Sequence, residues 1–249
     1  MVAPKKAKQV ATASKDQLPL FLQGKMDDDR GSENVQAEDL VIPRLELVQA
    51  LSKCRKKNDP ASIAGCEEGM LYNNLTRELY GESVNLVPVL FKKEWLLWRD
   101  QELGGGFAGA HATLAEAERE RQTQEDVDEW EAIETHQHFC LLVRDDGETE
   151  EVVVSMAKSK MKKSKQWNSL VRINGGPRFS RMYNYAGVAA QNDKNQDYFN
   201  VDVKNNGFVS EAVFLAAEKT YDSISSGGAK ADYSFEGDDG DTAGDEPEL

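Results

Sequence analysis

The stretch HFCLLVRDDGETEEVVVSM, residues 138–156, constrains the fold more than any other part of the sequence. Apolar or alternating runs lie on both sides of Asp145-Asp146-Gly147, and an Asp-Gly pair between such runs is the strongest short-range signal for a β-hairpin. A hairpin pairs its two strands antiparallel and needs no crossover helix. The sequence therefore predicts an antiparallel sheet around this hairpin.

Two further segments show the same organisation. In GMLYNNLTRELYGESVNLVPVLFKKEWLLW, residues 69–98, two β-rich runs flank a polar connection, and the second run is long, from Ser83 to about Trp98. Residues 175–208 indicate another pair of strands, with a turn near residues 192–196. Three hairpins of this kind are typical of a meandering antiparallel sheet.

Three segments have helical composition or spacing. Residues 112–130 are rich in Ala, Glu, Arg and Gln, and Ser210 is a suitable N-cap for a helix over residues 210–224. Between them, residues 157–171 would form a helix that buries a stripe containing Met161 and Trp167. No repeating βαβ unit accompanies these helices, so the predicted fold class is mainly β with inserted helices (α+β), a curled antiparallel sheet or small barrel.

The ends of the chain differ in composition from its middle. Residues 1–38 and 227–249 are polar or charged with few large apolar groups, and such segments cannot offset the entropy of ordering. We therefore predict a flexible N-terminal arm over residues 1–38, one folded domain over residues 39–226 and a disordered acidic tail over residues 227–249.

Charge is strongly segregated along the chain. The formal net charge is −14, yet residues 152–192 contain no Asp or Glu and hold eight basic residues, five of them lysines between Lys158 and Lys165. Acidic residues concentrate in residues 111–151 and in the tail from Asp232. A basic segment in an acidic chain predicts a negatively charged partner.

Single-stranded nucleic acid is the partner that this segment fits, because it requires cations for phosphates and flat rings on which bases stack. The candidates for phosphate contacts are Lys158, Lys160, Lys162, Lys163, Lys165, Arg172, Arg178 and Arg181, and those for stacking are Trp167, Tyr183 and Tyr185. A second candidate lies on the long strand, at Lys92, Lys93 and Trp95. The alternative interpretation is a solvated basic helix with ordinary core aromatics.

The tail would compete with the nucleic acid. A tethered polyanion occupies a cationic groove at high effective concentration until nucleic acid displaces it, and it is then free to bind other proteins. The residues that define it are Asp232, Phe235, Glu236, Asp238, Asp239, Asp241, Asp245, Glu246 and Glu248.

The combination of IPRLELVQALSK, the 69–98 segment and SMAKSKMKKSKQWNSL resembles a group of bacteriophage early proteins taken to be single-stranded DNA-binding replication proteins. The resemblance covers about Leu40 to Phe208, and an acidic C-terminal tail is a further shared feature. It implies an oligonucleotide-binding (OB) barrel, a role in phage DNA replication, recombination and repair, and recruitment of replication or recombination proteins through the tail. Tails of that group commonly end in an aromatic residue, whereas this chain ends in Leu249 and its nearest ring is Phe235.

Other classes of function have weaker support. Gly104, Gly106 and Gly109 satisfy G-x-G-x-x-G, but no βαβ series follows, so we interpret residues 101–110 as a loop. His136, His138 and Cys140 share one strand face without a fourth ligand at recognisable spacing. We expect no enzyme activity, cofactor or metal.

The expected cellular location of the protein rests on two signals that are missing from the sequence. No apolar run approaches the roughly 20 residues of a membrane span, and the basic start has no secretion signal. We therefore expect a cytoplasmic protein, in the host cytoplasm if viral, with reduced cysteines and no membrane partner. A homodimer, and docking of the basic helix on an acidic protein instead of DNA, remain open alternatives.

Overall fold

The computed structural model describes residues 30–35, 39–100, 103–192, 195–226 and 230–231. Contacts divide the chain into residues 1–36 and 37–249, which are described separately. In the first unit, residues 30–35 contain a turn in which the Val35 N–H donates to the Ser32 carbonyl oxygen at 2.9 Å. The predicted arm over residues 1–38 lies almost entirely outside the described residues.

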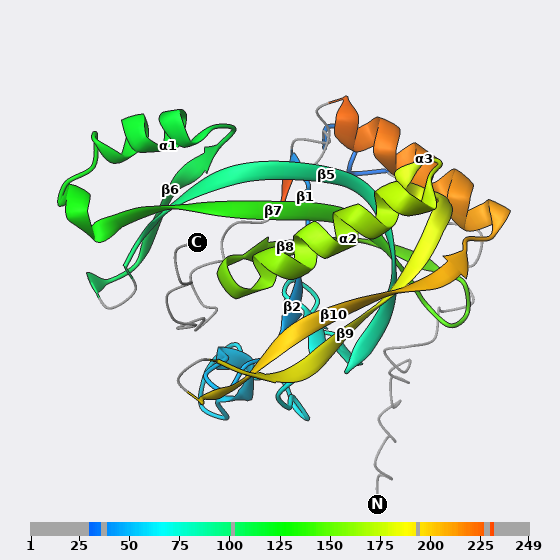
Figure 1. The fold of residues 1–249 in the computed structure, drawn as a ribbon, viewed down its shortest axis with the longest axis horizontal. Helices are drawn as coiled ribbons and strands as arrows, with labels where there is room; N and C mark the ends of the chain where they lie inside the picture. The colour runs from blue at the N-terminus through cyan, green and yellow to red at the C-terminus, as the bar shows by residue number, and fades with distance from the viewer. Residues whose placement is uncertain (1–29, 36–38, 101–102, 193–194, 227–229, 232–249) are drawn as a thin grey trace, which may run out of the picture. The chain divides into compact units, whose positions relative to one another are not determined.

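The centre of the second unit is a sheet of six antiparallel strands (Figure 1). Five of them form its main order, which is β10 (Asp197–Phe208), β9 (Arg181–Gln191), β5 (Ser83–Arg99), β7 (Trp130–Val143) and β8 (Thr149–Ala157). The sixth, β6 (Gly106–His111), pairs with the far end of β5. β5 is long enough to pair with β9 through its first residues, Ser83 to Leu86, and with β7 from Asn85 to Arg99.

Two small sheets accompany the large one. One has the order β2 (Leu45–Leu47), β3 (Leu71–Asn73) and β4 (Leu79–Gly81), and the other pairs β1 (Val41–Ile42) with β11 (Lys230–Ala231) in parallel. The three-stranded sheet approaches β9 closely at Gly187, where an added Cβ would collide with the Gly69 carbonyl oxygen. Gly187 is therefore required at this crossing.

The described residues form three helices, α1 (Leu114–Arg121), α2 (Met161–Asn174) and α3 (Glu211–Ser225), and the short 3₁₀ turns η3 (Lys53–Arg55), η5 (Val127–Glu129), η6 (Lys158–Lys160) and η7 (Arg178–Ser180). α1 begins with a complete capping box between Thr113 and Glu116. The N-cap of α3 is Ser210, whose Oγ accepts from the Val213 N–H. These caps satisfy backbone donors at the helix starts.

The two faces of the sheet have separate cores because side chains alternate along each strand. On one face, Leu86, Cys140 and Val154 pack with Trp167 of α2 and with the three-stranded sheet. On the other face, Val87 and Leu141 pack with α3. α2 and α3 therefore cover opposite faces, and α2 crosses the front of the sheet in Figure 1.

Most predicted elements agree with the structure. The hairpins β7–β8 and β9–β10, the helix near residues 157–171 and the helix after Ser210 are all present. Three predictions need correction. In the hairpin predicted over residues 69–98, β3 pairs with β4, whereas the long strand β5 pairs with β6, β7 and β9 in the large sheet. The helix predicted over residues 112–130 ends at Arg121, because Trp130 already begins β7, and the loop predicted over residues 101–110 contains β6 instead.

The sheet is antiparallel and open. Within the described part of the chain its edges are β10 and β8, and these two strands do not pair with each other. The fold class is thus mainly antiparallel β with three helices, and the hydrogen bonds of the described strands do not close a barrel.

Candidate nucleic-acid interface

α2 has one buried and one charged face. Ser164 and Trp167 point into the molecule and are fully buried, with 0% of either residue exposed. Lys162, Lys165 and Arg172 lie on the exposed side. The periodicity of the helix explains the division, since residues three or four apart share a face. The predicted apolar stripe and the predicted row of cations are therefore both present on one helix.

The exposed cations form a row along α2. Lys162, Lys165 and Arg172 follow one another at helical spacing and span about 15 Å at 1.5 Å per residue. Lys158, in the turn before the helix, is also exposed and lies 3.5 Å from a carboxylate oxygen of Glu131. Among the described residues no carboxylate lies within ion-pair distance of the other three. We call these four residues the α2 cation row.

Three of the other predicted phosphate ligands are engaged elsewhere. Lys160 is buried, with 6% of its surface exposed. Lys163 forms an ion pair with Asp202 of β10 at 2.9 Å, and its hydrogen bond holds the pKa of that carboxyl below its usual range. Arg178 donates to Asn168 Oδ1 at 2.9 Å and lies over the Phe91 ring. Lys163 and Arg178 thus hold α2 and η7 in place and Lys160 is poorly accessible, so these three are weaker candidates for phosphate contact than the exposed cations of α2.

The predicted stacking rings lie in the core. Trp167, Tyr183 and Tyr185 are 0%, 1% and 2% exposed and pack against one another, with ring centroids about 6 Å apart. The Tyr183 hydroxyl also accepts from the Asn174 side chain at 3.1 Å. A base cannot stack on a ring with no accessible face, so these three predictions are wrong. The prediction for Trp167 is wrong because its indole belongs to the apolar stripe that packs α2 against the sheet.

Trp167 stacks directly on His138, with centroids 4.6 Å apart and ring planes at 11°. His138 belongs to a buried hydrogen-bond chain between α2 and the sheet. Ser164 Oγ lies 2.7 Å from both His136 Nδ1 and His138 Nε2. At the two ends of the chain, Arg178 lies 2.9 Å from His138 Nδ1 and Glu134 lies 3.3 Å from His136 Nε2.

The donors and acceptors fix the direction of this chain. Arg178 is only a donor, so His138 Nδ1 accepts and His138 Nε2 carries the proton and donates to Ser164. Ser164 then donates to His136 Nδ1, and His136 Nε2 donates to Glu134. Both histidines are neutral in this arrangement. Burial lowers the pKa of both rings, and the positive charge of Arg178 lowers that of His138 further.

The structure places one exposed ring beside the remaining predicted arginine. Phe208, at the end of β10, is 72% exposed, and the Arg181 guanidinium lies over its ring at 3.9 Å from the centroid. The sequence did not single out Phe208 as a stacking candidate. A large ring after the polar run Asn205-Asn206-Gly207 was the available signal, because a lone aromatic residue in such a run has few apolar neighbours.

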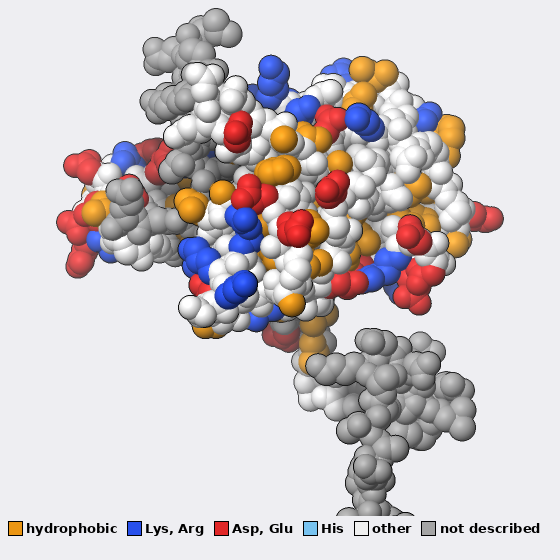
Figure 2. Space-filling model, turned by 90° about the horizontal axis from the view of Figure 1, so that it is seen from below, with side chains coloured by type: hydrophobic (Ala, Val, Ile, Leu, Met, Phe, Trp, Pro, Cys, Tyr) orange, Lys and Arg blue, Asp and Glu red, His pale blue; other side chains and the backbone are white. Residues whose placement is uncertain are grey.

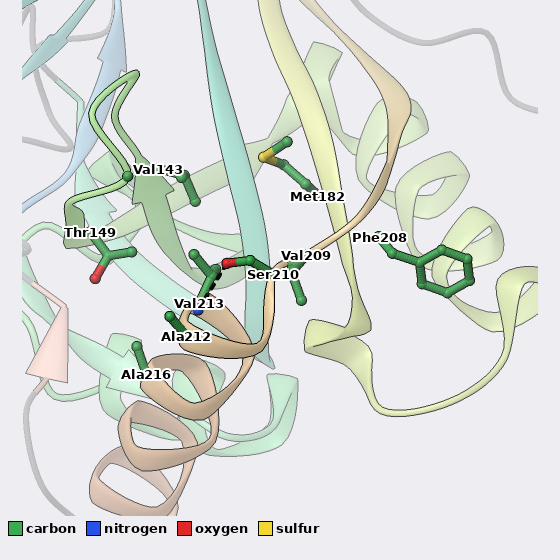
Figure 3. A pocket seen from close by; sticks show the side chains of 10 residues that line it. Val143, Thr149, Met182, Phe208, Val209, Ser210, Ala212, Val213 and Ala216 are labelled. Atoms are coloured by element: carbon green, nitrogen blue, oxygen red, sulfur yellow. Dashed lines mark hydrogen bonds between the residues drawn. The ribbon is translucent and has the colours of Figure 1, made fainter.

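Phe208 also stands at the rim of an apolar cleft of about 400 Å³. In Figure 3 its ring points away from the other labelled side chains, which come from the β7–β8 turn, β9 and the start of α3. No charged side chain lines this cleft. A phosphate would find no counter-charge in it, so the cleft is not part of the candidate interface.

The second predicted site, on β5, has partners within the sheet. Lys92 lies over the Phe139 ring, and Lys93 pairs with Glu134 at 2.9 Å while also lying over the half-buried Trp95. A lysine whose charge is already paired with a carboxylate attracts a phosphate less strongly than an unpaired lysine. This region therefore ranks below the α2 cation row.

Charge on the surface is mixed. The face shown in Figure 2 carries Lys and Arg side chains in several separate groups, with Asp and Glu side chains between them. The surface shown is not one continuous positive field. A site for a polyanion would therefore be a local one.

The remaining predictions have separate outcomes. Gly106 and Gly109 lie within β6 and not at a helix start, so they cannot form a phosphate loop. Among the described residues no cluster of three His, Cys, Asp or Glu side chains could hold a metal, and none of their helices is long and apolar enough to cross a membrane. The acidic tail from Asp232 lies outside the described residues.

Comparison with known proteins identifies the family. The family model of the Pam3 phage gp34-like protein matches residues 8–230, which is most of the chain. The chain therefore belongs to the Pam3 phage gp34-like family, a bacteriophage family. No curated protein and no solved structure matches the chain.

Proposed function

We propose that the protein binds single-stranded DNA without sequence preference and serves phage DNA replication, recombination or repair. The α2 cation row carries the proposal, because three of its four exposed cations lie on one helix and the fourth, Lys158, lies in the turn before it. Phosphates lie along a nucleic-acid strand at regular intervals, and a straight row of cations can contact several of them. Residues 152–192 contain no acid, so α2 itself adds no negative charge that would repel a phosphate.

Phe208 supplies the stacking part of the proposal. η7 and the start of β9 follow α2 directly in the chain, and Arg181 of β9 holds the Phe208 ring. An exposed ring held by a guanidinium leaves one face for a base. Phe208 thus replaces the three buried rings as the stacking candidate.

The OB-type barrel implied by the resemblance is part of the same proposal. The long, curved antiparallel sheet with α2 on one face supports it (Figure 1). OB folds bind single strands on the face of a curved sheet together with its adjoining loops. In this chain α2 covers that face, so we place the strand on the outer side of the helix.

Salt dependence of binding to oligo(dT) tests the phosphate contacts. If about four phosphates are neutralised, the logarithm of affinity falls against the logarithm of salt concentration with a slope near −3. A flat response would remove the electrostatic mechanism. Single- and double-stranded DNA and RNA of equal length, compared in one gel shift, report the preference for single strands.

A matched pair of variants tests the location. Replacing Lys162, Lys165 and Arg172 together by Gln should reduce the salt slope by about 2, since each lost contact removes about 0.7. Lys163→Gln is the control, because Lys163 already pairs with Asp202 on the same helix. Equal losses from Lys163→Gln and Lys165→Gln would exclude the α2 cation row as the site.

The tail is proposed as the competitor of DNA and as a docking site for replication or recombination proteins. Truncation before Asp232 should tighten binding to single strands, and most strongly at low salt, where the tethered anions compete best. Unchanged or weaker affinity in the truncated chain would refute the competition.

A second candidate is a non-enzymatic assembly protein whose basic helix docks an acidic protein. One observation favours it, since Ile173, next to Arg172, is 80% exposed and supplies an apolar contact typical of protein interfaces. Sedimentation of the full and the tail-truncated chain separates the two functions. Tail-dependent assembly without retention on single-stranded DNA would favour the assembly protein.

A further inference from the structure

Two cysteines meet in the loop between β2 and β3. Cys54 lies in η3 and Cys66 lies shortly before β3, and their Sγ atoms are 2.8 Å apart. Cys54 is 2% exposed, whereas Cys66 is partly accessible. A disulfide bond is about 2.05 Å long, so the two sulfurs are within about 1 Å of bonding distance.

The loop holds the two thiols together through its own backbone. The Ile63 N–H donates to the Cys54 carbonyl oxygen at 2.8 Å, and the Cys66 N–H donates to the Ile63 carbonyl oxygen at 3.2 Å. Within the same loop Arg55 forms an ion pair with Glu68 at 2.6 Å, and from outside the loop Arg77 donates to the Pro60 carbonyl oxygen at 2.8 Å. The approach of the sulfurs is therefore set by several contacts.

The other side of Cys54 has room for movement. A cavity of about 40 Å³ lies between Cys54, Ile63 and Tyr72. A thiol next to such a space can rotate without displacing core side chains. Cys140, by comparison, is buried in β7 and donates to the His138 carbonyl oxygen at 3.5 Å.

We propose that Cys54 and Cys66 form a dithiol site that reacts with small-molecule disulfides such as oxidised glutathione and closes to an intramolecular disulfide. The accessible Cys66 thiolate attacks one sulfur of the small disulfide, which forms a mixed disulfide and releases one thiolate. Cys54 then loses its proton to solvent and attacks Cys66 Sγ, and a second thiolate leaves. The protein loses two hydrogens and two electrons, and the small disulfide is reduced to two thiols.

The environment of Cys54 makes the second step the slower one. Burial and the hydrogen bond to Cys66 raise the pKa of the Cys54 thiol. Only a small fraction is thiolate at neutral pH, and the thiolate is the nucleophile. Closure should therefore accelerate by up to about tenfold per pH unit between pH 7 and 9.

The test uses the reduced full-length protein and oxidised glutathione. After an acid quench, remaining thiols are alkylated in denaturant and the intact mass is measured. The expected product is a monomer that has lost two hydrogens and carries one alkyl group, on Cys140. Peptides cut at Arg55, Lys56 and Lys57 stay linked through Cys54 and Cys66. A stable glutathione adduct on Cys66, or a disulfide-linked dimer, would overturn the proposal.

Two variants sharpen the result. Cys140→Ser should leave the rate and product of closure unchanged. Cys54→Ser should stop the reaction at the Cys66 adduct, and loss of that adduct would contradict Cys66 as the entry thiol. Closure of the loop 54–66 should raise the Tm of the oxidised wild type by about 5 to 10 °C over the reduced form. An unchanged Tm would contradict a bond made within the native loop.

Discussion

The two faces of α2 have opposite roles in this molecule. The inner face inserts Trp167 and Ser164 into the molecule, where Trp167 stacks on His138 and Ser164 links His136 and His138 in a directed hydrogen-bond chain. The outer face carries Lys162, Lys165 and Arg172, with no described acid in ion-pair range. Residues a single turn apart thus belong either to the buried packing of the helix or to its exposed charged side. The side chains that the sequence placed together in one nucleic-acid site lie on both faces of the helix.

The largest effect should come from the inner face. Trp167→Ala should destabilise the protein by about 3 to 5 kcal/mol, because it removes a fully buried ring and leaves a cavity beside His138. Urea unfolding measures the loss. Lys165→Ala on the outer face is the control and should change stability by less than about 0.5 kcal/mol. Similar losses from both variants would end the distinction between the faces.

Lowering the pH should destabilise the packing of the inner face of α2 against the sheet. The folded-state pKa of His136 and His138 lies below the usual 6.5, so the unfolded chain binds protons at a higher pH than the folded one. The contribution of these two histidines to the free energy of unfolding is therefore fully present above about pH 6.5. It is lost as the pH falls toward their folded-state pKa values, by up to about 1.4 kcal/mol per pH unit for each histidine.

Urea titrations between pH 7 and 5 measure this dependence. The range lies above the region where the carboxylates with lowered pKa, Glu78, Glu134 and Asp202, lose their charge. His136→Gln should make the dependence shallower, since one titrating ring is gone. Stability that stays constant down to pH 5 would contradict a pair of neutral buried histidines.

A smaller effect should follow from breaking the centre of the hydrogen-bond chain. Ser164→Ala leaves His136 Nδ1 and His138 Nε2 without their shared partner, at a cost of about 1 to 3 kcal/mol. Ser169→Ala is the matched control on the outer face, where the hydroxyl donates only to the Lys165 carbonyl oxygen. An equal effect of the two variants would argue against the chain.

The smallest change in stability, with a change in binding instead, should come from Phe208→Ala. Loss of one stacked base costs about 1 to 3 kcal/mol of binding to a single strand. Leu215→Ala, on the exposed side of α3, removes a side chain of comparable exposure and should leave binding unchanged. Unchanged affinity of the Phe208 variant for oligo(dT) would leave the α2 cation row without a stacking partner.

Local patterns predicted much of the fold. The Asp145-Asp146-Gly147 turn and the runs beside it place β7 and β8, and Ser210 places the start of α3. The helix after residue 112 was predicted too long, because its composition continues past Arg121 while pairing with β5 draws Trp130 into the sheet. β6 was missed because its glycines carry no strand preference and only its partner β5 stabilises it.

The candidate site was predicted in part. The exposed lysines follow from helical spacing, and the same spacing predicted a buried stripe through Trp167. Helical spacing alone does not show whether a residue at the edge of that stripe is buried or exposed. The pairing of β5, β7 and β9 decides it, because their register directs His138 and Tyr183 toward α2 and encloses the indole between them.

By itself the sequence determined where strands turn, where helices begin and that one segment is basic within an acidic chain, because these depend on residues near one another along the chain. Only the tertiary structure decided which cations remain free, which rings are enclosed and which two thiols meet. These depend on residues from distant segments, such as Asp202 beside Lys163 and Arg181 beneath Phe208. Long-range strand register brings such partners together, and periodicity within one element does not report it.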